Sequence, residues 1–440
     1  MYLRGSKFDM NRRRKPFNYF KIITLVAAIG FVMYFGVVIG PQVQSSIGPT
    51  PTVTRDPESF VTEAGQLFDQ GKLPQAIQAY QQAVRAIPND ASAYVSLARV
   101  QVWAGQYQEA QTSAENALLL SPNNSTAHAV RGWALDFQTN YLESEASIKR
   151  ALELDDKNAL AHAYYAELLT DEYLSGTGPL DAIDKAAEES RVALSLAPNL
   201  LEAHRARGYV YEMTGNPEQA IGEYEAAVAI NKNIANLHLM LGRVYRAMGV
   251  YDKAVESLNR ANTLNPSDPT PLYLISRVYA TVGEYKKAEQ YAQQAIKISP
   301  SDTNQRGNLG VMYYRENKWP EAAAELTLVV NGGKDQDGVE ITPIELSADT
   351  ARSSEYYFTY GLVLVRLNRC GEALPLFQKL LSTVPGDEIA VYNANEGIRL
   401  CSIAAGTPQS PETGTPGTGT PEAGTPVSAK TKTPAVTPTP

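Results

Sequence analysis

Four histidines and two cysteines are the residues of this sequence whose types could support metal or redox chemistry. The histidines are His128, His162, His204 and His238, and the 440-residue chain has no others. Imidazole nitrogens are common zinc ligands, so these positions are the first candidates for a metal site. Whether they can share one ion depends on how far apart the folded elements hold them.

The two cysteines, Cys370 and Cys401, limit the chemistry that sulfur can provide. Two cysteines cannot build a framework of several disulfides or a zinc site with four cysteine ligands. They can form one disulfide, or they can be two small buried residues, and both interpretations stay open.

Motifs of known catalytic or cofactor-binding type are missing from the sequence. It has no G-x-S-x-G, no H-E-x-x-H and no phosphate-binding G-x-x-x-x-G-K-[ST] loop. The segment from Asp335 to Gly338 faintly resembles a calcium loop, but Leu346 stands where the bidentate glutamate is needed. We therefore predict a protein that is not an enzyme and has no cofactor and no bound metal.

The charge of the chain is concentrated at its N-terminus. Residues 1–21 carry a net charge of +6, whereas the whole chain carries −8, so the remainder is strongly acidic. An acidic body argues against binding to the phosphate backbone of nucleic acids. A basic N-terminus is instead typical of a segment on the cytoplasmic side of a membrane.

An uncharged run from Ile22 to Ile39 follows the basic segment. As a helix, these residues would span about 27 Å, close to the thickness of a bilayer's hydrocarbon core. The run is longer than the core of a cleaved signal peptide, and a poor cleavage site follows it. We predict an uncleaved transmembrane signal anchor over 22–39, with the rest of the chain outside the cytoplasm, in a bacterial cell envelope.

Two segments have the composition of unstructured chain. Residues 40–56 are rich in Pro, Thr and Ser and read as a linker. Residues 405–440 consist mainly of Thr, Pro and Gly and have too little apolar bulk to fold. We predict a disordered tail there.

The part between these segments contains a repeat. Ala83 and Pro88 recur as Ala117 and Pro122, 34 residues later. A second signal, Gly-x-(Tyr/Leu)-x-x-Ala, precedes each copy, as at Gly105. Apolar residues at helical spacing define a first helix, glycine breaks it, and proline ends a second helix. The unit is therefore a pair of helices that must stack on its neighbours to bury its apolar face.

The length of this unit and its small-residue and proline positions resemble those of the tetratricopeptide-repeat (TPR) family. The resemblance implies an all-α, right-handed superhelix over residues 57–387. Six of the eight steps between repeats are 34 residues, and the others are 42 and 51. The nine predicted repeats begin at Pro57, Ala91, Ser125, Ala159, Leu201, Ala235, Pro269, Thr303 and Ser354.

The resemblance also places the two insertions and the end of the stack. The longer steps locate the insertions within residues 173–180 and 331–353, at loops, which a solenoid tolerates. Residues 388–404 read as one more helix, which would cap the stack. Cys370 and Cys401 would then lie at the same end of adjacent helices, within reach of a disulfide.

The resemblance gives the histidines a structural interpretation. All four fall at one position of the first helix, which in the family packs between neighbouring helices. Adjacent packed helices are about 8–10 Å apart, too far for histidines on different helices to share a zinc ion. We therefore expect packing rather than metal binding.

The family uses its concave face, lined by the first helices, to grip peptides or proteins. Matching the pattern predicts a binding groove of eleven residues: Arg99, Trp103, Trp133, Phe137, Tyr164, Arg205, Tyr209, Arg243, Arg246, Tyr273 and Arg277. Aromatic residues and arginine anchor many interfaces, and the arginines suggest an acidic partner. We predict a membrane-anchored scaffold for protein–protein interaction. The alternative is a structural or carbohydrate-binding protein of the cell envelope or wall, attached through its tail.

Overall fold

The computed structural model describes residues 19–35, 37, 56–347 and 351–406. The chain divides into two compact units, residues 1–59 and 60–440, and each is treated by itself. Most of the basic segment, of the linker and of the tail lies outside the described residues. The predictions made for those segments stay predictions.

The N-terminal unit contains helix α1, which spans Tyr19–Tyr34. Its sixteen residues are mostly apolar, and its large side chains are exposed, as shown by Phe31 at 65%. Among the described residues, no helix is both long enough and apolar enough to cross a membrane. The transmembrane helix predicted over 22–39 is therefore not supported, since α1 ends at Tyr34 and residues 36, 38 and 39 are not described.

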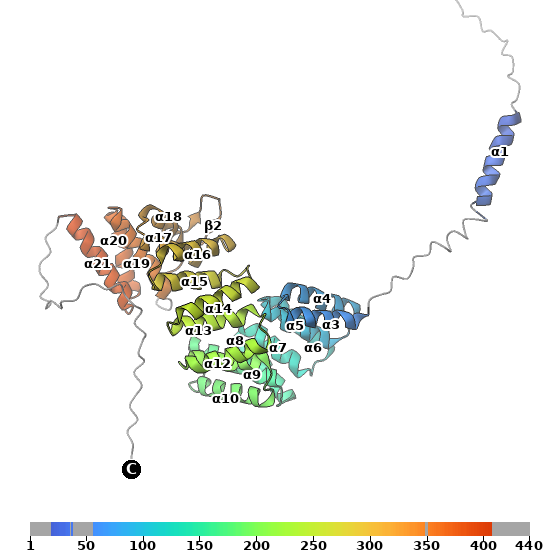
Figure 1. Ribbon diagram of the computed structural model, residues 1–440, viewed down its shortest axis with the longest axis horizontal. Helices are drawn as coiled ribbons and strands as arrows, with labels where there is room; N and C mark the ends of the chain where they lie inside the picture. Colours follow the sequence, from blue (N-terminus) through green and yellow to red (C-terminus); the bar gives the residue numbers. More distant parts are fainter. Residues whose placement is uncertain (1–18, 36, 38–55, 348–350, 407–440) are drawn as a thin grey trace, which may run out of the picture. The chain divides into compact units, whose positions relative to one another are not determined.

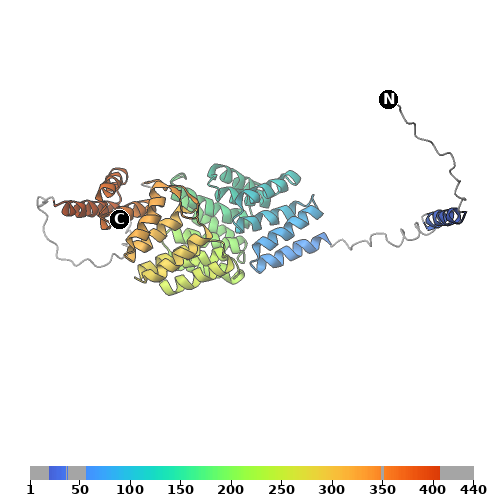
Figure 2. The same cartoon turned by 90° about the horizontal axis from the view of Figure 1, so that it is seen from above.

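The second unit is a row of helix pairs that stack side by side (Figures 1 and 2). One further helix, α21 (Glu388–Ala404), follows the last pair. The pairs are α3 (Pro57–Asp69) with α4 (Leu73–Ala86), α5 (Ala91–Trp103) with α6 (Tyr107–Leu120), α7 (Ser125–Asp136) with α8 (Tyr141–Leu154), α9 (Ala159–Ser175) with α10 (Ala182–Leu196), α11 (Leu201–Met213) with α12 (Pro217–Ile230), α13 (Ala235–Ala247) with α14 (Tyr251–Leu264), α15 (Thr270–Thr281) with α16 (Tyr285–Ile298), α17 (Thr303–Arg315) with α18 (Trp319–Asn331), and α19 (Ala351–Arg366) with α20 (Cys370–Thr383).

The first helix of each pair begins close to the residue that the sequence predicts. Only α15, which starts one residue late, and α19, which starts three residues early, differ from the expected register. Several first helices begin after an N-cap whose side chain accepts a backbone N–H. Asp90 accepts that of Ser92, and Asn124 accepts that of Ala127. These bonds satisfy N–H groups that lack a partner within the helix.

Turns between the two helices of a pair need a residue with positive φ. Gly105 and Gly249 supply it, with φ of 76° and 74°. Glycine adopts this conformation at little steric cost. Thr139 occupies the same turn of the third pair with φ of 59°, which is unfavourable for a β-branched residue.

Small residues let the two helices of a pair approach closely. A Cβ atom added at Gly208 would lie 2.5 Å from the ring of Tyr224, and one at Gly242 would lie 2.5 Å from Leu258. Both partner side chains are fully buried. The small-residue positions of the repeat are therefore contact points between helices, and the core runs between the paired helices along the row.

The two insertions have different structures. The first lengthens α9, which continues to Ser175 before Gly176 ends it. The second forms a two-stranded antiparallel hairpin, β1 (Gly333–Lys334) with β2 (Glu340–Ile341), in which Gly333 pairs with Ile341. The regular structure of the described residues is helical, as predicted, apart from this short hairpin, which the sequence analysis did not include.

Asp335 holds the turn of the hairpin. Its carboxylate accepts the backbone N–H groups of Asp337 and Val339 and forms an ion pair with Arg306. Arg306 also bonds to Glu325 at 2.9 Å. Asp335, the first residue of the segment that faintly resembles a calcium loop, therefore fixes the hairpin against α17.

Candidate binding surface on the first helices

The eleven residues predicted to bind a partner lie on, or at the end of, the first helices from α5 to α15. Their contacts divide them into two groups. We call the first group the aromatic cluster: Arg99, Trp103, Trp133, Phe137, Tyr164, Arg205 and Tyr209. We call the second group the arginine cluster, which contains Arg243, Arg246, Tyr273 and Arg277 together with Arg352 of α19.

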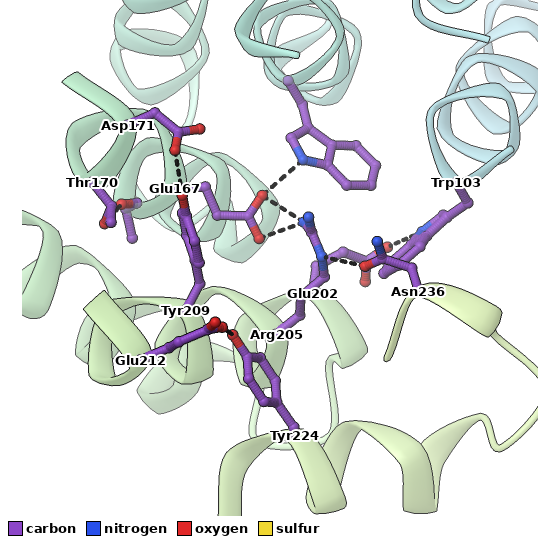
Figure 3. Close-up of polar contacts among 12 residues, drawn as sticks. Trp103, Glu167, Thr170, Asp171, Glu202, Arg205, Tyr209, Glu212, Tyr224 and Asn236 are labelled. Carbon is purple, nitrogen blue, oxygen red and sulfur yellow. Dashed lines mark hydrogen bonds and ion pairs between the residues drawn. The ribbon is translucent and has the colours of Figure 1, made fainter. Parts of the chain in front are cut away.

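Arg205 is the centre of the aromatic cluster (Figure 3). Its guanidinium donates to both carboxylate oxygens of Glu167, at 2.5 and 2.6 Å, and only 6% of the residue is exposed. Trp133 donates its indole N–H to the same carboxylate at 2.8 Å. The guanidinium carbon also lies 5.3–5.5 Å from the ring centroids of Trp103, Trp133 and Phe137. Ion pairing and cation–π contacts therefore hold this arginine in place.

A second ion pair joins helices that are far apart in the sequence. Arg99 on α5 contacts Glu202 on α11 at 2.6 Å, and Trp103 donates to the same oxygen at 3.2 Å. Burial disfavours the charged form of Glu202, but Arg99 outweighs this effect, and the pKa of Glu202 lies below its usual value. Glu202 is therefore an ionised, fully buried carboxylate that links the second pair to the fifth.

The end of α3 and the turn that follows it make a further contact between distant repeats. Asn231 donates to the carbonyl of Phe68 at 3.3 Å, and Asn233 donates to that of Asp69 at 2.8 Å. A Cβ atom at Gly71 would collide with the backbone of Asn233. The row thus curves until its first pair touches the segment between the fifth and sixth pairs.

The sequence predicts an open binding groove at the aromatic cluster, but the inner side of the curve is filled by side chains. Trp133 and Tyr164 stack with their centroids 4.3 Å apart, and both are buried. Trp103 and Arg205 are also buried, whereas Arg99, Phe137 and Tyr209 are half-buried. The long side chains of neighbouring first helices meet one another and fill the inner side of these repeats.

Buried carboxyl groups surround the aromatic cluster. Tyr209 donates to Asp171 at 2.5 Å, and Asp136 has one carboxyl oxygen without a hydrogen-bond partner among the described residues. Burial, followed by the nearby Asp171 and Glu167, raises the pKa of Asp136 well above its usual value. Burial therefore favours the neutral form of Asp136, which limits the negative charge in this interior.

The arginine cluster is more open than the aromatic cluster. Arg243 pairs with Glu212 and Arg277 pairs with Glu355, each at 2.9 Å. Arg352 lies over the ring of Tyr273, with its guanidinium carbon 4.8 Å from the centroid. Arg246 and Arg352 are exposed, and neither forms an ion pair within the described part of the chain.

The arginines of this cluster lie close enough to affect one another electrostatically. Desolvation lowers the pKa of Arg246, and the positive charges of Arg277, Arg243 and Arg352 lower it further. Arg246 stays protonated, because a guanidinium group holds its proton far above neutral pH. Like charges gathered in one place attract an anion.

The four histidines share one structural role. The Nε2 atom of each lies 2.9–3.0 Å from the carbonyl oxygen six residues earlier, that of Pro122, Asp156, Pro198 or Lys232. Each imidazole therefore ties a first helix to the turn that precedes it. Among the described residues, no group of three or more His, Cys, Asp or Glu side chains is placed to hold a metal ion.

Cys370 and Cys401 form a disulfide in the structure, with Cα atoms 5.6 Å apart. Cys370 is the first residue of α20, and Cys401 lies near the end of α21. The bond therefore ties the last helix to the last pair.

Two family models for tetratricopeptide repeats match the sequence, at residues 67–134 and 239–303. The first match runs from the end of α3 into α7 and the second from within α13 to the start of α17, and both include turns described above. The protein belongs to the tetratricopeptide-repeat family.

Solved structures with a similar helical arrangement include other TPR proteins. PilW, described as a widely conserved type IV pilus biogenesis factor, is 20% identical over 47% of this chain and 91% of its own, with a TM-score of 0.42. A TPR protein from Parabacteroides merdae is 16% identical over 58% of this chain and 98% of its own (TM-score 0.38). Pseudomonas aeruginosa pilF is 18% identical over 52% and 96% (TM-score 0.37). No curated protein matches the sequence.

The eleven residues predicted from the TPR pattern do not include Arg352 and Glu355, which contact Tyr273 and Arg277. Arg352 and Glu355 belong to α19, which follows the second insertion and begins before the predicted start at Ser354. No signal in the sequence relates these residues to Arg277 and Tyr273. TPR solenoids in general bind partners on extended concave surfaces. Among the described residues of the two clusters, the exposed arginines without an ion pair belong to the arginine cluster.

Proposed function

We propose that this TPR protein is a scaffold that binds an acidic segment of another protein at the arginine cluster. One observation carries the proposal: Arg246 and Arg352 are exposed beside Tyr273 and form no ion pair among the described residues. Planar guanidinium groups bind carboxylates through two parallel hydrogen bonds. Tyr273 adds an aromatic surface of the kind that anchors interfaces.

The aromatic cluster has a supporting part in this proposal. Its members Arg99, Phe137 and Tyr209 are half-buried and could extend the contact along the first helices. Trp133, Tyr164 and Arg205 are too deeply buried to touch a partner without rearrangement, so they fix the curvature of the repeats.

Binding of synthetic peptides tests this function. The probes are ten-residue peptides rich in Asp and Glu, and the controls replace these residues with Asn and Gln. We expect only the acidic peptides to bind, with an affinity that falls as salt is added. Equal binding of acidic and amide peptides would contradict the proposal.

A pair of double variants locates the site. Arg246→Glu/Arg352→Glu should weaken binding of acidic peptides by about tenfold or more, because two guanidinium contacts become repulsive. The control is Arg150→Glu/Arg191→Glu, which changes the same charge at exposed residues of α8 and α10. Equal loss in both variants would mean that net charge, and not this cluster, determines binding.

We also propose that residues 22–39 anchor the chain to a membrane, with the repeats on the side opposite the cytoplasm. The support is the uncharged run and the basic segment before it. Extraction of membranes with alkaline carbonate tests the anchor, and protease added outside spheroplasts tests the orientation. Release by carbonate, or repeats that resist external protease, would contradict this part of the proposal.

A further inference from the structure

Helix α21 is fixed to the preceding pair through one face. Ala390, Ala394 and Cys401 are buried there, and the disulfide joins Cys401 to α20. A Cβ atom at Gly397 would lie 2.1 Å from the ring of Phe377, so this part of α21 lies directly against α20. These contacts fix which face of α21 packs on α20 and which face points away from the stack.

The opposite face of α21 carries large apolar side chains. Ile389, Tyr392 and Ile403 are 67%, 70% and 55% exposed. Together with Glu396 and Arg399 they follow the spacing of 3 and 4 residues that forms one stripe along a helix. The last helix of a solenoid needs a polar outer face for solubility. This stripe therefore has the character of a contact surface, and we call it the α21 stripe.

The sequence that follows α21 is a poor match for this surface. Residues 407–440 contain Val427 and Val436 but no Leu, Ile, Met or aromatic residue. Covering the apolar side chains of the α21 stripe needs side chains of comparable size, and the tail lacks them.

The α21 stripe is complementary to itself. In an antiparallel pair of α21 helices related by a twofold axis between positions 397 and 398, Tyr392 faces Ile403 of the other copy. In the same register Glu396 faces Arg399 of the other copy. The apolar side chains of Tyr392 and Ile403 then meet, whereas Ile389 lies beyond the end of the partner helix. Glu396 and Arg399, which also form an ion pair within their own helix, meet the opposite charges of the other copy at the centre. Such a match of a patch with its own copy is what a twofold interface requires.

We propose that the α21 stripe is a dimerisation surface that pairs with the same stripe of a second copy of this chain. A helix of 17 residues is about 25 Å long, so the contact is at the small end of specific interfaces. We therefore expect a reversible dimer with a dissociation constant on the order of 1–100 µM.

Sedimentation equilibrium of the full chain in mild detergent, from about 1 to 100 µM, tests the dimer. Tyr392→Glu and Ile403→Glu should each weaken it by about tenfold or more, because each buries a charge against an apolar side chain. Leu142→Glu is the control, since Leu142 is 81% exposed on α8 and lies outside the stripe. An unchanged melting temperature shows that each variant is folded. A single-chain mass across the whole range would overturn the proposal, and so would a dimer that both stripe variants leave intact.

Charge reversal tests the register of the pair. Glu396→Arg alone and Arg399→Glu alone each place like charges opposite one another, so each variant should dimerise more weakly than the wild type. An equimolar mixture of the two should recover dimers, because every facing pair then has opposite charges. A mixture that associates no better than its components would overturn the antiparallel register.

Discussion

The guanidinium of Arg99 lies 2.6 Å from the carboxylate of Glu202, although 103 residues separate them in the sequence. In a solenoid, each repeat usually contacts only its neighbours. Here the ion pair joins the second pair of helices to the fifth. The first five pairs therefore have a contact that closes their curve, which makes their interior a core rather than an open groove.

Removing Arg99 should destabilise this part of the fold. Arg99→Ala leaves Glu202 charged and buried without its partner, which costs about 3 kcal/mol in comparable buried pairs. Urea unfolding followed by tryptophan fluorescence measures the loss. The control is Arg131→Ala, whose partner Glu115 is exposed, so that the pair should contribute about 1 kcal/mol or less. Equal effects of the two substitutions would show that Arg99 and Glu202 do not close the curve.

Replacing Arg205 should open the aromatic cluster. Arg205→Ala removes the cation that lies against Trp103 and Trp133 and leaves Glu167 unpaired. We expect water to reach the indole rings and the tryptophan emission to shift to longer wavelength. The third tryptophan of the chain, Trp319, lies outside the cluster and contributes a constant background. Emission identical to that of the wild type would mean that the rings pack without the arginine.

His204 should give the fold a dependence on pH. Its hydrogen bond to Glu223, at 2.7 Å, raises its pKa above the value in the unfolded chain. This stabilisation is complete below about pH 6.5 and is lost as the pH rises through the folded-state pKa. Glu223→Gln should therefore cost more stability at pH 5.5 than at pH 8, measured by urea unfolding.

Glu223→Gln also removes the ion pair between Glu223 and Arg207. We expect this loss to be the same at pH 5.5 and at pH 8, so it does not change the difference in stability between the two pH values. His238 offers a contrast, because burial lowers its pKa. Its contribution is present above about pH 6.5 and decreases as the pH falls. A Glu223→Gln effect that does not vary with pH would contradict the role assigned to His204.

Loss of the disulfide should affect only the end of the solenoid. Cys401→Ser removes a link that closes a loop of about 30 residues, which contributes about 3–4 kcal/mol in the loop-entropy description. We expect faster hydrogen exchange in α20 and α21 and unchanged exchange in α5 to α15, because repeats interact mainly with their neighbours. Faster exchange throughout the chain would show that the cap stabilises the whole stack.

Thr139→Gly should stabilise the protein. Thr139 has a φ of 59°, a conformation that costs a β-branched residue about 1 kcal/mol and costs glycine much less. We expect a gain of about 0.5–1 kcal/mol, measured by urea unfolding. Asn317→Gly, at the corresponding turn of α17 and α18, should gain less, since asparagine tolerates positive φ. A loss of stability at Thr139 would mean that its side chain contributes more than the backbone costs.

The sequence predicts the repeats well because their signals are local. Gly105 breaks a helix and Pro122 follows one, and a regular spacing of 34 residues extends these local signals along the chain. The second insertion interrupts the 34-residue spacing before α19. This helix begins three residues before its predicted start at Ser354, so the predicted repeat did not include Arg352.

Contacts between distant repeats could not be predicted in this way. The pairs Arg99–Glu202 and Asn233–Asp69 depend on how strongly the row curves, and curvature adds up from small rotations between successive pairs. The repeat pattern also shows that the histidines recur at one position of the first helix. It does not show that each histidine bonds to the carbonyl six residues earlier, because that bond depends on the geometry of the turn.

Cross-linking of native membranes followed by mass spectrometry tests the proposed scaffold function most directly. The comparison is between the wild type, Arg246→Glu/Arg352→Glu and the control Arg150→Glu/Arg191→Glu. We predict that a partner cross-linked to α13, α15 or α19 in the wild type and in the control is lost from the first variant, and that its cross-linked segment is rich in Asp and Glu. Cross-links to these helices that persist in Arg246→Glu/Arg352→Glu would contradict the account.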